Sequence, residues 1–284
     1  MSSRAMAGTA RHTGVRYWSA LALIGVVGGV LSGLFAIGGG ILMEPLLVWR
    51  AQLDQRRASA TSLAAIVPAA VVGSATYIAN GEVDVPAAAF IAIGAAGGAV
   101  IGSALLRRIP LVALRWMFIF FILAVAARLL FVAPQRGPDL ALSPAVALGY
   151  IAVGLVMGVA SGLFGIGGGI IAVPLLISFF AVSDLVAKGT SLLVTIPTSL
   201  VGTVANRRAG LVDIRVALVV GVAAAVAAVP AAGLALLMSA RLSGVLFSAL
   251  LIAVAIQLTA KSIRAARNNA GRSRSADGTP QAGR

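Results

Sequence analysis

The sequence predicts an all-α polytopic membrane protein built from two inverted-topology repeats, and three observations lead to that fold class. First, 60% of the 284 residues are hydrophobic and only 11% are charged, whereas soluble domains carry about a quarter charged residues. Second, apolar runs of about 20 residues recur from Tyr17 almost to Lys261, and each is long enough to cross the hydrocarbon core as a helix. The third observation is an internal duplication.

Two segments of the chain are close copies of one another. Residues 25–47 align without gaps with residues 154–176 at an offset of 129 residues, and 16 of these 23 positions are identical. The same offset pairs two further motifs: Thr61-Ser62-Leu63 with Thr190-Ser191-Leu192, and Gly81-x-Val83-Asp84 with Gly210-x-Val212-Asp213. Because paired repeats are a recurrent plan of secondary transporters, we expect two homologous units.

Each unit holds four apolar stretches. In the first unit they are residues 18–49, 58–79, 86–106 and 112–133, and in the second 144–180, 188–206, 214–237 and 242–260. We therefore divide the chain into a cytoplasmic N-terminal tail (1–16), repeat 1 (17–133), a linker loop (134–143), repeat 2 (144–262) and a basic, disordered cytoplasmic tail (263–284). Each repeat is expected to supply about three transmembrane helices plus its opening stretch.

The opening stretch of each unit is interrupted by three glycines and a proline. Glycine costs about 1 kcal/mol relative to alanine inside a helix, so the run at 38–40, copied at 167–169, predicts a break. Pro45 and its copy Pro174 then act as structural hinges near the start of a second short helix, where a missing N–H does little harm. The alternative is a kinked helix whose small residues simply allow close packing.

The distribution of lysine and arginine bears on how these stretches lie in the membrane. If each opening stretch crossed once, the repeats would point the same way and basic residues would divide 14 inside to 8 outside. If each stretch is a re-entrant hairpin, the second repeat is inverted and the division becomes 18 to 4. The positive-inside rule favours the inverted arrangement, with both termini cytoplasmic. An alternative in which the opening stretch crosses fully with a kink and a short segment then returns would also leave the chain on its entry side, so the second repeat would again be inverted.

The broken stretches are the candidate binding sites for an anion. Free N–H groups and the helix dipole at the start of a short helix attract negative charge, and glycine keeps the approach open. The duplicated Thr-Ser pairs add hydroxyl donors, although bonding to their own preceding turn is the alternative. The predicted substrate-binding residues are Gly38, Gly39, Gly40, Thr61, Ser62, Gly167, Gly168, Gly169, Lys188, Thr190 and Ser191.

Lys188 and Glu44 are charged residues whose repeat partners are uncharged. Lys188, whose repeat partner is Ser59, either attracts anions at the outer mouth or snorkels to the interface. Glu44 has Val173 as its partner and lies within the apolar hairpin. Because intramembrane acids often serve as proton-relay groups, Glu44 is a candidate for proton coupling. The alternative is an interfacial carboxylate paired with Arg50.

Composition also excludes several classes of function. The chain has no cysteine and its single histidine, His12, lies in the polar tail, so we expect no metal site, no cofactor and no catalytic residues. The net charge of +14 resides between apolar runs and in the tails, where it meets anionic lipid heads of the bilayer rather than nucleic acid. An enzyme is therefore not expected. The oligomeric state is left open.

At the paired Ile-Gly-Gly-Gly-x4-Pro-Leu-Leu and Thr-Ser-Leu motifs, the sequence resembles the TauE/SafE sulfite exporter family of membrane permeases. The resemblance spans essentially the whole membrane region. It implies transport of sulfite, sulfonates, sulfoacetate or related organic anions across a bacterial inner membrane, with the glycines and prolines at the core of the transport site. Glu44 departs from the small or aliphatic residue expected before that proline. The resemblance fixes neither the substrate nor the direction of transport.

These observations together predict a secondary transporter of small anions that works by alternating access between the repeats. The glycine run lacks the Gly-x4-Gly-Lys-Ser/Thr spacing of a nucleotide-binding loop, so a proton or electrochemical gradient is the expected driver. A passive anion channel and a non-transporting membrane scaffold are the alternatives.

Overall fold

The computed structural model describes residues 14–105, 143–164 and 167–277, together with positions 116, 119, 120, 123, 126 and 127. The apolar stretch predicted at 112–133 lies outside the described residues except for those isolated positions. The linker up to residue 142 and the N-terminal tail up to residue 13 also lie outside them. In the part of the chain that is described, all regular structure is helical.

The helices follow the order of the predicted apolar stretches. They are α1 (Val15–Phe35), α2 (Gly40–Arg50), α3 (Gln55–Ala79), α4 (Val85–Leu105), α6 (Pro144–Phe164), α7 (Gly169–Phe180), α8 (Asp184–Arg208), α9 (Ile214–Leu237) and α10 (Ala240–Asp277). Seven of these helices, all but α2 and α7, contain a segment long and apolar enough to cross a membrane. The prediction of an all-helical, multi-pass membrane protein is therefore confirmed.

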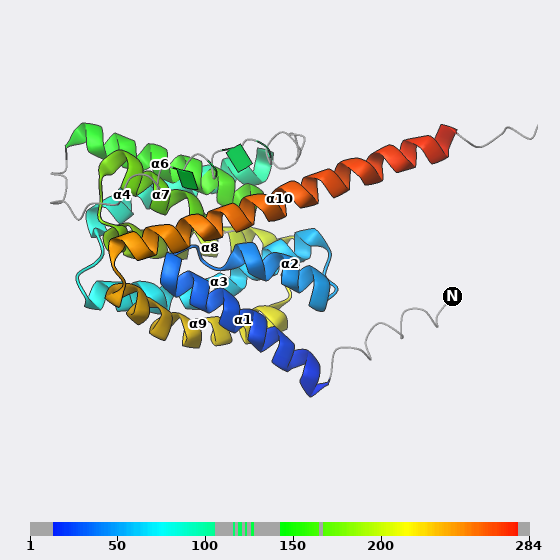
Figure 1. Cartoon of the computed structure of the whole chain (residues 1–284), viewed down its shortest axis with the longest axis horizontal. Helices are drawn as coiled ribbons and strands as arrows, with labels where there is room; N and C mark the ends of the chain where they lie inside the picture. The colour runs from blue at the N-terminus through cyan, green and yellow to red at the C-terminus, as the bar shows by residue number, and fades with distance from the viewer. Residues whose placement is uncertain are drawn as a thin grey trace, which may run out of the picture.

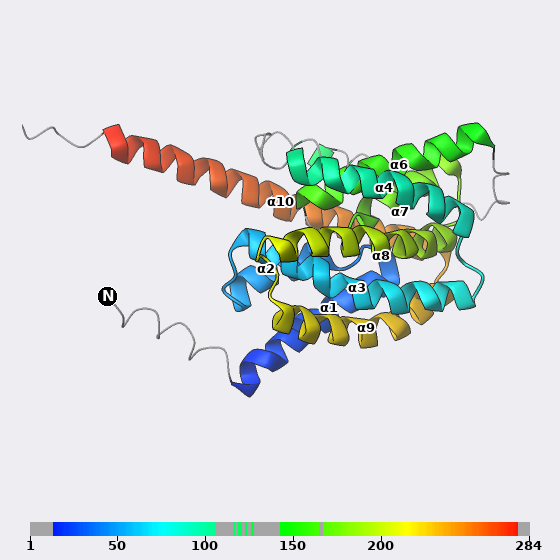
Figure 2. The same ribbon diagram turned by 180° about the vertical axis from the view of Figure 1, so that it is seen from behind.

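The spanning helices lie side by side along the long axis of the molecule (Figure 1). The start of α1 and the far end of α10 lie at the same end of the bundle, as the view from behind also shows (Figure 2). Helix α10 continues past residue 262, where we expected an unstructured tail to begin. Residues 261–267 contain only Lys, Ser, Ile, Arg and Ala, and this composition lets the helix propagate.

Short polar caps determine where several helices begin. Asp54 accepts hydrogen bonds from the first backbone N–H groups of α3, and Asp213 does the same for α9. Ser183 caps α8 through Val186 N–H, and Asp84 accepts from Ala87 N–H in α4. Each cap satisfies donors that a helix start leaves free, so the helix boundaries are encoded locally.

Glycines allow the helices of opposite repeats to pack backbone to backbone. Helix α1 packs mainly on α9, and its counterpart α6 packs on α4. A Cβ added at Gly25 or Gly29 would lie 2.3 or 2.2 Å from a carbonyl oxygen of α9. Gly154 and Gly158 are their repeat partners, and a Cβ added there would lie 2.0 or 2.1 Å from a carbonyl oxygen of α4. Small-residue packing of this kind is typical of membrane helices, and here it joins the two repeats.

Candidate functional site

Each long opening helix breaks at the predicted glycines. Helix α1 ends at Phe35 and the chain turns through Ala36, Gly38 and Gly39, whose φ angles are 57°, 74° and 72°. In repeat 2, Gly167 and Gly168 have φ angles of 78° and 80°, and α7 begins at Gly169. These left-handed conformations are open to glycine at little cost, so the glycine run turns the chain sharply between two helices.

In each hairpin the short helix runs back to the start of the long one. Arg50, the last residue of α2, donates a hydrogen bond of 3.2 Å from Nη2 to the carbonyl oxygen of Arg16 and lies 5.5 Å from the centre of the Tyr17 ring. In repeat 2, the ring of Phe180 at the end of α7 lies 4.6 Å from that of Tyr150 near the start of α6. Both segments are therefore hairpins with a long and a short arm.

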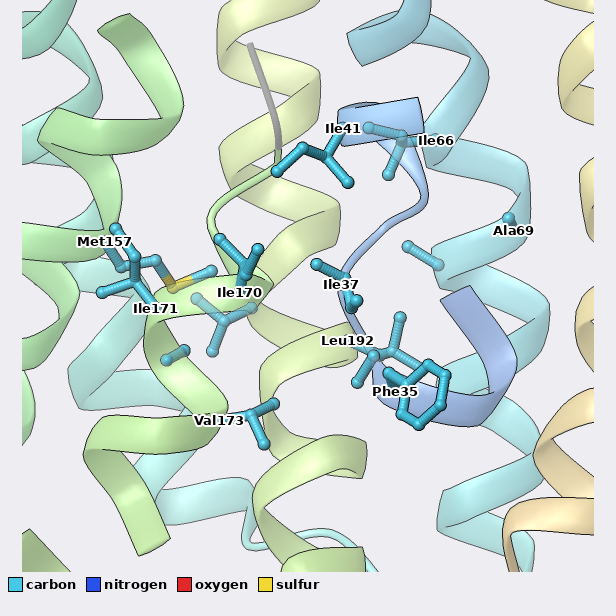
Figure 3. Close-up of a cluster of buried hydrophobic side chains, with 14 of the residues drawn as sticks. Phe35, Ile37, Ile41, Ile66, Ala69, Met157, Ile170, Ile171, Val173 and Leu192 are labelled. Atoms are coloured by element: carbon cyan, nitrogen blue, oxygen red, sulfur yellow. The ribbon is translucent and has the colours of Figure 1, made fainter. Parts of the chain in front are cut away.

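The two hairpins meet in the middle of the protein. A Cβ added at Gly169 would lie 2.0 Å from the carbonyl oxygen of Ala36, so the backbone of one turn touches that of the other. Ile37 and Ile170, one from each hairpin, lie side by side at this point (Figure 3). The surrounding side chains are apolar and buried: Ile37, Ile41, Ile66, Ile170 and Leu192. The meeting point is closed by these side chains.

Backbone N–H groups at the two turns begin the short helices without a side-chain cap. Gly39 and Gly168 are the N-caps of α2 and α7, and neither helix start receives a side-chain cap. The backbone amides of residues 40–41 and 169–170 open these two helices at buried positions. Buried amides at a helix start are strong donors, and the helix dipole adds positive potential there. These amides are the groups that an anion could bind.

The prolines lie deeper in the short helices than we expected. Pro45 and Pro174 are each the sixth residue of their helix rather than in its first turn, because α2 and α7 begin at the third glycine. The missing N–H groups therefore deprive the carbonyls of Ile41 and Ile170 of their helical i+4 donors. Each short helix thus begins with amides that no side chain caps and contains a carbonyl that loses its i+4 donor.

The structure separates the threonine of each Thr-Ser pair from the serine. Thr190 Oγ1 accepts a hydrogen bond of 3.0 Å from the backbone N–H of Asp84, and Thr61 Oγ1 accepts one of 3.1 Å from that of Asp213. We call these the crossed threonine bonds. Because each bond joins the beginning of α3 or α8 to the segment after the end of the other, the two helices run antiparallel.

The two serines point to different surroundings. Ser62 Oγ donates to the carbonyl oxygen of Ser59 at 3.0 Å, the intrahelical bond that we gave as the alternative. The buried Ser191 hydroxyl has no hydrogen-bond partner among the described residues. One turn further along α8, Thr195 donates to Ser191 O and to Gly167 O. Ser191 therefore belongs to a polar strip that reaches the second glycine turn.

We expected Lys188 either to attract anions at the outer mouth or to extend its side chain to the membrane interface. In the structure it does neither, because its side chain is enclosed by protein. Its side chain is 1% exposed, and its Nζ lies 3.7 Å from Asp184 Oδ2 and 2.5 Å from Ser243 Oγ. The internal partners allow the charge to stay inside the protein. We did not identify Asp184 or Ser243 from the sequence, although the i,i+4 spacing of Asp184 and Lys188 was a usable signal. Glu44 is half-buried on α2.

The two hairpins also differ in which of their two helices supplies a buried methionine. Met43 of α2 packs against Gly28 of α1, where an added Cβ would lie 2.1 Å from the methionine Cε. The residues at the matching positions of repeat 2 are Ala172 and Met157, and Met157 packs against Gly168. The large side chain thus comes from the short helix in one hairpin and from the long helix in the other.

The comparisons with known proteins agree with this architecture. A family described as "Sulfite exporter TauE/SafE" matches residues 2–129 and 150–282. The chain is 26% identical over 198 residues to "Probable membrane transporter protein YunE" of Bacillus subtilis (strain 168), covering 61% of this chain and 72% of that protein. It is 33% identical over 108 residues to "Probable membrane transporter protein YdhB" of the same organism, covering 38% and 44%. No solved structure matches the chain.

Proposed function

The chain belongs to the TauE/SafE sulfite exporter family of multi-pass membrane transporters, and from this membership we propose that it is a secondary transporter of sulfite, sulfonate or related organosulfur anions. The family is one of transporters rather than enzymes. The observation that supports an anionic substrate is the pair of glycine turns that meet in the centre of the bundle. The backbone amides at these turns, which no side chain caps, offer donors for an oxyanion from both repeats.

The proposed topology places the two hairpins in the membrane from opposite faces. In each hairpin the chain turns back at the glycines and returns to the side from which it entered, so three other helices of each repeat cross fully. The repeats are then inverted and both termini are cytoplasmic in a bacterial inner membrane. Antiparallel α3 and α8 support this arrangement, as do the arginines gathered near the paired ends of α2, α3, α8 and α9. The domain boundaries follow the duplication, with repeat 1 at residues 17–133 and repeat 2 at 144–262.

The same geometry supports transport by alternating access. The two crossed threonine bonds lie at opposite ends of the α3–α8 pair, and both are formed in this structure. Each bond closes one side, so the structure corresponds to an occluded state. The glycines, Ser62 and Ser191 surround the substrate in this scheme, and Glu44 on the short arm of the first hairpin is the proposed proton-coupling group.

Flux into proteoliposomes tests this proposal. Purified protein should move sulfite, sulfate, sulfoacetate or taurine, with a carboxylate as the comparison, and the rate should depend on the pH gradient if protons are coupled. Accumulation above the external concentration separates a transporter from a passive channel. If no anion of the panel moves under any gradient, the proposed function is wrong and a scaffold role is favoured.

A further inference from the structure

An ion pair is buried inside the second repeat. Lys188 and Asp184 lie one turn apart on α8, and their side chains are 1% and 2% exposed. The Lys188 ammonium also donates to Ser243 on α10, so it joins two helices. Removing two charges from water costs more than such a pair usually regains, and ionisable groups inside membrane proteins usually serve function. The pair therefore requires a reason other than stability.

The duplication offers an internal comparison for this pair. At the common offset, Asp184 corresponds to Gln55 and Lys188 to Ser59, so repeat 1 has neither charge. Helices α3 and α8 are nevertheless both 25 residues long. Their threonines Thr61 and Thr190 make equivalent crossed bonds. The same architecture therefore forms without the ion pair, and the fold does not explain why repeat 2 keeps it.

The ammonium group is held one helical turn away from residues that pack near the end of α1. Along α8, Lys188 is one turn before Leu192, which belongs to the apolar centre where the hairpins meet (Figure 3). Ser243 is one turn before Phe247 on α10, and the Phe247 ring stacks at 5.7 Å on Phe35, the last residue of α1. Both residues of the Lys188–Ser243 contact thus lie one helical turn from side chains that pack around the break in α1.

We propose that the Lys188 ammonium is the cationic subsite for the transported anion and that Asp184 is the counter-ion which the anion replaces. The inference rests on the proposed anion transport and adds an exchange of partners to it. The Nζ–Oδ2 separation of 3.7 Å exceeds the 2.7–2.9 Å of a charge-assisted hydrogen bond. An anion that reaches hydrogen-bonding distance therefore forms a stronger contact than the one it displaces, and Ser243 keeps the ammonium in place.

This exchange also specifies the class of substrate. An anion without a cationic group, such as sulfite or sulfoacetate, gains the full attraction of Lys188. Taurine carries its own ammonium group, which repels Lys188 in a site of low dielectric. We therefore expect the protein to transport sulfoacetate in preference to taurine. Both are sulfonates, but the second charged group is negative in sulfoacetate and positive in taurine.

Opposite effects of two single substitutions test the exchange in reconstituted protein. Lys188→Met should raise the KM for sulfite about 10- to 100-fold, because one charge-assisted contact is lost. Asp184→Asn should lower the KM, because it removes the competing carboxylate. Arg241→Met, which removes an exposed cation near the start of α10, is the matched control and should leave the KM unchanged.

A double substitution separates folding from binding. Asp184→Gln with Lys188→Ser copies the residues of repeat 1, so the protein should elute as the same species with a similar thermal midpoint but should show the raised KM. An unchanged KM in this variant, a raised KM in Asp184→Asn, or equal transport of taurine and sulfoacetate would overturn the inference alone. A wild-type protein that moves no anion would overturn the proposed function, and the inference with it.

Discussion

At Gly39 two constraints coincide. Its φ of +72° lies in the left-handed region, and an added Cβ would lie 2.2 Å from the carbonyl oxygen of Gly28. Gly81 has nearly the same φ, +74°, but no heavy atom lies within 4 Å of the position of its Cβ. An alanine at Gly81 would suffer backbone strain alone, whereas an alanine at Gly39 would suffer the same strain and a steric clash as well.

We expect Gly39→Ala to be much more damaging than Gly81→Ala. The Gly81 variant should lose only the left-handed strain, about 1–2 kcal/mol, whereas the Gly39 variant must also push α1 and α2 apart at the turn. Thermal unfolding in detergent and sulfite flux measure the two effects. Similar losses in both variants would show that the contact of Gly39 with Gly28 does not matter.

Other features of single residues could not be predicted, because their environment is built by distant parts of the chain. The glycine run signalled a turn, since glycine's backbone freedom is a local property. Met43 and Met157 gave no such signal, because their exchange is visible only once the short helix lies on the long one. The burial of Lys188 likewise depends on Ser243 of another helix.

At the scale of elements, the crossed threonine bonds hold α3 and α8 together at both ends. Both bonds link a side chain of one repeat to the backbone of the other, at 3.0 and 3.1 Å. In the proposed cycle one bond must open while the other stays closed. Each threonine is therefore expected to influence access from one side of the membrane only.

Thr190→Val and Thr61→Val should each open the site toward one side. The chain has no cysteine, so Ser191→Cys provides a single label site in the buried polar strip. Loss of one hydrogen bond is worth about 0.5–1.5 kcal/mol, so labelling should accelerate about two- to tenfold, from opposite sides in the two variants.

Thr76→Val is the control, because the hydroxyl of Thr76 bonds only to the carbonyl of Val72 in its own helix. Thr190→Val that labels no faster than this control would argue against a gating role of the crossed bonds.

The positions of the helices along the chain could largely be predicted from the sequence, but which helices pack against one another could not. The stretches expected at 58–79 and 214–237 correspond to α3 and α9 within three residues, since apolar runs and polar caps are local signals. The sequence did not show that α1 packs mainly on α9 of the other repeat, because a glycine face does not specify which helix covers it.

For the whole molecule, the inverted arrangement can be tested directly. Ala79 and Arg208 are repeat partners at the ends of α3 and α8, and both are exposed. Single cysteines at these positions should be labelled by an impermeant reagent from opposite sides of the membrane, with Ala79→Cys reached from outside. Labelling of both from the same side would contradict the inverted topology.

The packing of α1 on α9 and of α6 on α4 has a further consequence for the history of the protein. Among the described residues, each half packs the glycine face of its opening helix mainly against the other half, so a single half would leave that face uncovered. Two copies of one ancestral half, inserted in opposite orientations, would have satisfied every one of these contacts as a homodimer. Within one chain each half can diverge, and the methionine exchange and the buried Lys188–Asp184 pair are differences that a symmetric dimer could not carry on one side alone.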